Sequence, residues 1–202
     1  MNFSCLAALA GGESLAGLLW AEARDRRSAR AAPKVATSLG FVGLALSSGA
    51  RDSYGRLVLG GLVLSLAGDA ILLSRERRAF LLGLLAFLGA HLAYAAAFAL
   101  ASRPRGLALL PLAAVSGVAL RWLWPHLGSL RLPVSIYTTA ITAMLWPALG
   151  SSRLEVGCGA LLFYLSDLLV ARGAFGAPGK VNQLAGWPLY YAGQYLIAAS
   201  VG

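Results

Sequence analysis

The sequence predicts an all-α integral membrane protein, a single domain over residues 1–202 that forms a bundle of eight transmembrane helices. Hydrophobic residues make up 58% of the chain and charged residues only 12%, about half the share found in an average soluble domain. The apolar residues form runs of about 20, the length that crosses a hydrocarbon core. The runs are rich in Leu and Ala and lack the alternation of a membrane β-barrel.

Short, mostly basic segments separate the apolar runs and set the predicted helix boundaries. The predicted spans are 3–22, 33–49, 56–73, 79–101, 106–124, 131–149, 155–172 and 184–201. Lys and Arg are denser in the connections after the first, third, fifth and seventh spans. By the positive-inside rule these connections face the cytoplasm and both termini lie outside. We therefore expect a multi-pass protein of the cell membrane, the inner membrane in a bacterium.

The formal net charge of +9 would also suit a protein that binds nucleic acid. The basic residues, however, lie between spans rather than on one folded face, and topology and anionic lipid headgroups explain them there. The expected partners are therefore membrane lipids and not nucleic acid, with a homodimer left open.

Two aspartates lie in apolar runs that resemble each other. Asp69 lies in the run 64–73 and Asp167 in the run 162–171, each directly after a small residue. An ionised carboxylate costs about 2.5–3.5 kcal/mol at the centre of a membrane helix, so each aspartate needs a specific reason to be there. Both predicted spans run toward the cytoplasm, and both carboxyls would lie about 8–9 Å above the basic rim. We expect them to face each other inside the bundle as a catalytic pair.

A histidine lies on the clearest helical face of the sequence, in the span 79–101. His91 would be an intramembrane imidazole about 18 Å from the cytoplasmic start of its span, deeper than the aspartates. A hydrogen-bonded core histidine and a functional histidine, which would contact the substrate, both fit this position. Steps of three and four place the following residues on its face: Phe80, Gly83, Phe87, Tyr94 and Phe98.

Several other polar residues are candidates for binding a substrate. Lys34 begins the span 33–49 and is expected at the headgroup level, where it could pair with a phosphate or simply extend to water. Gln194 lies too deep to reach the headgroups and must find a partner inside the bundle. Glu13, in the first span, is either neutralised in the core or functional. The further candidates are Thr37, Tyr94, Tyr137, Tyr190 and Asn182.

The sequence argues against several kinds of membrane enzyme and predicts neither a metal nor a cofactor. The chain has two histidines, His91 and His126, so a three-histidine zinc site cannot form. Neither a serine-hydrolase elbow nor a phosphate-binding loop occurs. A carboxyl pair in a low-dielectric pocket remains. Two such groups do not both ionise easily, so they would supply a proton donor beside an anion, which suits acid-catalysed cleavage through an oxocarbenium-like state.

From about residue 33 to its end, the chain resembles the YhhN-like lysoplasmalogenase family. The resemblance implies hydrolysis of the vinyl ether bond of a lysophospholipid, a lysoplasmalogen, to a fatty aldehyde and glycerophospho-ethanolamine or -choline. It also implies that the headgroup meets Lys34 and that the alkenyl chain enters the bundle. The features that carry it are the segment 33–37, the Gly68-Asp69 helix, the His91 face, Tyr137 with Met144, Gly159 with Ser166-Asp167, and Tyr190 with Gln194.

Two alternative functions use the same carboxyls. An intramembrane aspartyl protease also has two aspartates on neighbouring helices, but only Gly68-Asp69 partly resembles its motifs. A non-enzymatic, proton-coupled lipid carrier would use the aspartates to bind protons. Cleavage of a peptide or proton-coupled uptake without product would distinguish these alternatives.

Overall fold

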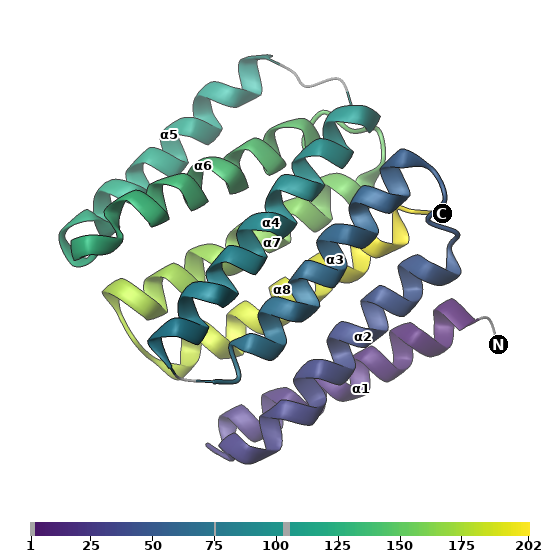
Figure 1. Ribbon diagram of the computed structural model, residues 1–202, viewed down its shortest axis with the longest axis horizontal. Helices are drawn as coiled ribbons and strands as arrows, with labels where there is room; N and C mark the ends of the chain where they lie inside the picture. Colours follow the sequence, from purple (N-terminus) through teal and green to yellow (C-terminus); the bar gives the residue numbers. More distant parts are fainter. Residues whose placement is uncertain (1–2, 75, 103–105) are drawn as a thin grey trace.

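The computed structural model describes residues 3–74, 76–102 and 106–202, and in these residues it contains eight α-helices and no strand (Figure 1). The all-α prediction is confirmed. The helices are α1 (Phe3–Ala23), α2 (Ala31–Ser47), α3 (Ser53–Ile71), α4 (Arg77–Ala101), α5 (Gly106–Leu123), α6 (Arg131–Ala148), α7 (Leu154–Ala171) and α8 (Lys180–Ala199).

Within the described part of the chain, four helical segments are long and apolar enough to cross a membrane. They are Ser53–Ile71, Arg77–Ala101, Ala108–His126 and Leu154–Gly176. The other four predicted spans remain predictions: α2 has only 17 residues, and α6 and α8 place polar side chains inside the bundle. Helix α8 also begins at Lys180, four residues before the predicted start at 184, so that it includes Asn182.

The turn from α2 to α3 shows how the sequence ends one helix and begins the next. Gly49 adopts a positive φ of 83°, a conformation that glycine takes without steric cost and that commonly ends helices. Asp52 then caps α3, because its side chain accepts a hydrogen bond from the Gly55 amide at 2.8 Å.

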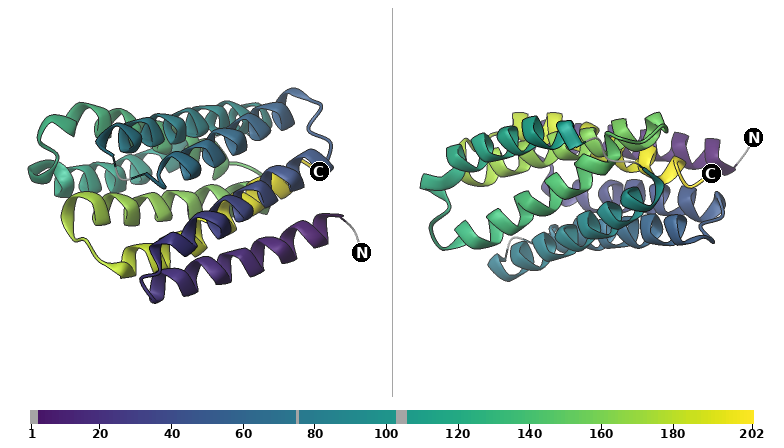
Figure 2. Two further views of the ribbon diagram at one scale, coloured as in Figure 1. Left: turned by 60° about the horizontal axis from the view of Figure 1, so that its bottom comes forward. Right: turned by 90° about the horizontal axis from the view of Figure 1, so that it is seen from above.

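The helices pack in two layers, with further helices along the two edges. In Figure 1, α2, α3 and α4 lie side by side in front, and α7 and α8 lie behind them; Figure 2 shows the same separation from above. Helix α1 packs on α2 and α8, while α5 and α6 close the opposite edge, where α6 contacts both α4 and α7. The C-terminal ends of α3 and α7 and the N-terminal ends of α2, α4, α6 and α8 therefore gather at one end of the bundle.

Glycines allow the closest helix contacts. A Cβ atom on Gly159 would lie 3.0 Å from the carbonyl oxygen of Gly193, and one on Gly193 would lie 2.8 Å from the carbonyl oxygen of Gly159, so α7 and α8 meet backbone to backbone. A Cβ on Gly68 would lie 2.6 Å from the ring of Phe87, which fixes the distance between α3 and α4 directly beside Asp69.

Candidate functional site: a cavity with two aspartates

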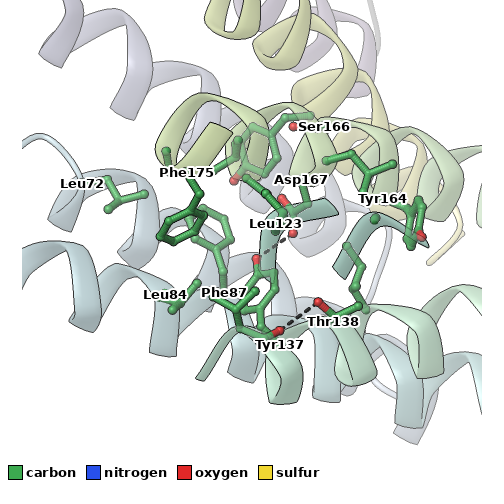
Figure 3. Close-up of a pocket in the computed structure, with 18 of the residues that line it drawn as sticks. Leu72, Leu84, Phe87, Leu123, Tyr137, Thr138, Tyr164, Ser166, Asp167 and Phe175 are labelled. Carbon is green, nitrogen blue, oxygen red and sulfur yellow. Dashed lines mark hydrogen bonds between the residues drawn. The ribbon is translucent and has the colours of Figure 1, made fainter. Parts of the chain in front are cut away.

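A cavity of about 160 Å³ lies at the end of the bundle where these helix ends gather (Figure 3). Its walls are mainly apolar, and its polar groups include both aspartates of the matching runs. The residues that line it are Lys34, Asp69, Leu72, Phe80, Leu84, Phe87, Ala119, Leu120, Leu123, Val134, Tyr137, Thr138, Ile141, Tyr164, Ser166, Asp167, Leu168, Val170, Ala171, Ala174, Phe175, Trp187 and Tyr190.

Asp69 lies near the end of α3 and is held by three donors from two other helices. Its Oδ1 lies 3.2 Å from Nζ of Lys34. Its Oδ2 accepts hydrogen bonds from the hydroxyls of Ser38 at 2.7 Å and Tyr190 at 2.8 Å. The residue is buried, with 2% of its surface exposed. A buried carboxylate is tolerated when it is paired and hydrogen-bonded in this way.

Lys34, at the start of α2, forms an ion pair inside the protein instead of extending its side chain to water. Its side chain is only 11% exposed and its ammonium group faces Asp69. The physical reason is that a buried carboxylate and a buried ammonium group each need an opposite charge. Lys34 still lines the cavity, but as the counter-charge of Asp69.

Asp167 lies near the end of α7 in a different environment. Its Oδ2 accepts a hydrogen bond from the Tyr137 hydroxyl at 2.6 Å, and Figure 3 shows Tyr137 pointing toward it across the cavity. The same oxygen lies 3.3 Å from Nε2 of His91. Its neighbours are thus a phenol and an imidazole, and its side chain is 13% exposed.

His91 is fully buried behind Asp167 and is absent from the cavity lining. Its Nδ1 lies 2.7 Å from the Phe87 carbonyl oxygen. Its ring stacks on Phe163 with centroids 4.5 Å apart and meets the Tyr137 ring edge-on. Counting residues along the helix axis places His91 deeper than the aspartates, but it includes neither helix tilt nor side-chain length. The ring of His91 nevertheless reaches Asp167.

The two aspartates line one cavity, but each has its own partners. We predicted that they face each other as a catalytic pair, a proton donor beside an anion. In the structure Asp69 interacts with Lys34, and Asp167 with Tyr137 and His91. The cavity therefore has one cationic partner for two acidic groups.

Several predicted residues lie away from the cavity. The hydroxyl of Tyr94 donates to Oε1 of Gln194 at 2.6 Å, so each provides the interior partner that the other needs. Thr37 is buried and donates to the Pro33 carbonyl of its own helix. Glu13 is exposed on α1, rather than neutralised in the core.

Asn182 lies in the first turn of α8, next to the connection that leads from α7. Its Oδ1 accepts from Arg172 at 2.9 Å and its Nδ2 donates to the Ala177 carbonyl at 2.7 Å, so it holds this connection in place. Ser38, conversely, is a partner of Asp69 that the sequence does not point to directly. Its spacing of four residues from Lys34 could have indicated a shared helical face.

Comparison with known proteins decides the family. The YhhN family profile matches residues 29–201, nearly the whole chain after α1. The chain belongs to the YhhN family.

Curated relatives of this YhhN protein carry the name lysoplasmalogenase. The protein is 36% identical over 152 residues to bovine Lysoplasmalogenase TMEM86A, covering 69% of this chain and 62% of the bovine protein. It is 39% identical over 162 residues to human Lysoplasmalogenase TMEM86B, covering 80% and 69%. It is 35% identical over 155 residues to Lysoplasmalogenase of Mycobacterium tuberculosis, covering 71% and 59%. The match thus spans about 60% of the length of the bovine and mycobacterial relatives, and no solved structure matches.

Proposed function

We propose that this YhhN protein is a lysoplasmalogenase-like membrane hydrolase that cleaves the vinyl ether bond of a lysoplasmalogen. The products are a fatty aldehyde and glycerophospho-ethanolamine or -choline. One observation carries the proposal: two carboxyls, Asp69 and Asp167, line a single cavity with mainly apolar walls. The names of the curated relatives support it.

The first step is protonation of carbon. One aspartate gives its proton to the vinyl carbon farther from the ether oxygen; the O–H bond breaks, and the π electrons form the new C–H bond. A lone pair of the ether oxygen then forms the C=O⁺ bond of an oxocarbenium ion. The second aspartate, as an anion, stabilises this cation in a setting of low dielectric.

The second step adds water and releases the products. The anionic aspartate takes a proton from water while the water oxygen bonds to the cationic carbon, which gives a hemiacetal. That proton then passes to the glycerol oxygen as its bond to carbon breaks, and the hemiacetal O–H proton returns to the first aspartate. Both carboxyls end in their starting states, so the cycle consumes one water per ether bond.

The substrate is proposed to approach from the cytoplasmic leaflet. The cavity lies at the helix ends next to the more basic connections, where the phosphate of the headgroup would meet Arg and Lys side chains. The mainly apolar walls would hold the alkenyl chain. In this proposal the helices form eight spans in a cell membrane, with both termini outside, membrane lipids as partners and no metal or cofactor.

The experiment incubates the purified protein with a panel of lysolipids and identifies products by mass spectrometry. The panel holds lysoplasmalogens with ethanolamine or choline headgroups and matched 1-alkyl and 1-acyl lysolipids. We expect aldehyde from the vinyl ethers alone, and its loss in Asp69→Asn and Asp167→Asn. Near-normal rates in both variants would refute the mechanism. Release of fatty acid from the acyl lipid instead, or cleavage of a peptide, would refute the substrate assignment.

A further inference from the structure

The hydrogen-bond partners of His91 define its tautomer. A backbone carbonyl only accepts hydrogen bonds, and the Phe87 carbonyl oxygen lies 2.7 Å from Nδ1 of His91. Nδ1 therefore carries a hydrogen, and in a neutral imidazole the other nitrogen, Nε2, is then an acceptor with a bare lone pair.

This tautomer creates a conflict at Asp167. Nε2 is fully buried and has no aligned hydrogen-bond partner among the described residues, yet Oδ2 of Asp167 lies 3.3 Å from it. An ionised carboxylate is also only an acceptor. The lone pairs of Nε2 and of Oδ2 would then face each other with no hydrogen between them, which is repulsive. A proton between them removes the conflict, and a neutral pair of this kind suits a site walled by the Phe163 and Tyr137 rings better than a buried ion pair does.

We propose that Asp167 holds a proton directed at Nε2 of His91, which makes Asp167 the acid of the reaction and His91 its positioning residue. Asp69, paired with Lys34, is then the anion. The role assignment rests on the proposed function, whereas the shared proton does not. His91 is kept from the substrate by its burial and acts through Asp167, unlike the expected role in substrate binding.

The proton can be located without any enzymatic assay. The chain has two histidines, so ¹⁵N-histidine NMR of His126→Phe, whose replaced residue lies outside the cavity lining, reports on His91 alone. We expect a neutral ring with hydrogen on Nδ1. Infrared spectra should contain the C=O stretch of a protonated carboxyl that disappears in Asp167→Asn, persists in Asp69→Asn and shifts in His91→Phe. An imidazolium, hydrogen on Nε2, or a band that disappears with Asp69 would overturn the proposal.

Kinetics then test the role. His91→Phe retains an aromatic ring to stack on Phe163 but removes both nitrogens. We expect kcat to fall about 10–100-fold with KM changed less than about twofold, and His91→Gln, which keeps an acceptor, to recover part of the loss. In the Asp167→Asn background, His91→Phe should cause no further loss. Additive losses, or a fall matched by a lower thermal unfolding midpoint and equal in the Gln variant, would show a structural role only. Absence of aldehyde in the wild type would refute the proposed function and leave the spectroscopic result to decide the shared proton.

Discussion

Asp69 and Asp167 lie in similar stretches of sequence near the ends of two helices, yet their surroundings differ in kind. Asp69 has a cation and two hydroxyl donors around it. Asp167 has a phenol and an imidazole in aromatic surroundings. The difference comes from α2, α4, α6 and α8, which supply the partners. The local sequence places a carboxyl at the cavity, and the neighbouring helices supply the partners that determine its chemistry.

The largest effect is expected when each of the two carboxyls is replaced in turn and the two variants are compared. Asp167→Asn should lower kcat for aldehyde release about 10³-fold, because it removes the proposed proton donor, and should change the thermal unfolding midpoint little. Asp69→Asn should lower both activity and stability, because it leaves Lys34 buried without a counter-charge. Steady-state kinetics and thermal unfolding in detergent measure the two effects. Equal losses of stability would contradict the difference between the two sites.

The next effect tests the ion pair itself. Lys34→Met leaves Asp69 buried without its cation and should destabilise the protein by about 3–5 kcal/mol. The double variant Lys34→Met/Asp69→Asn should regain much of that loss, since both charges are then absent. Lys180→Met, at an exposed lysine, is the matched control and should unfold like the wild type. Chemical unfolding in mixed micelles measures all three, and a double variant no more stable than Lys34→Met would argue against the pair.

The two tyrosines give a finer comparison. A hydrogen bond to a charged group is worth about 1.5–3 kcal/mol and one between neutral groups about 0.5–1.5 kcal/mol. Tyr190→Phe, beside the ion-paired Asp69, should therefore cost more stability than Tyr137→Phe, beside the protonated Asp167. The same unfolding measurement gives both values. The reverse order would indicate that the assignment of charge to the two carboxyls is inverted.

The smallest effect concerns the residue before Asp69. Gly68→Ala places a methyl group against the Phe87 ring and should cost on the order of 1 kcal/mol through overpacking. Gly60→Ala, on the same helix with nothing within 4 Å of the added Cβ, should instead stabilise by about 0.5–1 kcal/mol. Unfolding midpoints of the two variants should move in opposite directions; a loss of stability in both would contradict the expected gain in helix propensity at Gly60.

The sequence predicts the helices and many of the residues at the cavity, because both depend on local patterns. Runs of apolar residues define the helices, and polar residues inside such runs identify Asp69, Asp167 and Tyr190. Contacts between helices are harder to predict. The pairing of Lys34 with Asp69 and of His91 with Asp167 depends on how each helix is rotated and tilted, which spacing along one helix does not determine.

The close contact of Gly159 with Gly193 limits how the proposed lipid substrate can enter the cavity. Each carbonyl oxygen fills the space that a methyl group would need on the other helix, so α7 and α8 keep a fixed spacing, and with it the separation of the backbones that carry Asp167 and Tyr190. If the cavity widens, the movement must come from a helix that packs less closely on its neighbours. Helix α5 fits this description: it packs mainly on α6 and contributes Leu120 and Leu123 to the lining. In the proposed reaction, the alkenyl chain of the substrate would then enter sideways along α5, while the proposed catalytic groups keep the positions that the glycine contact sets.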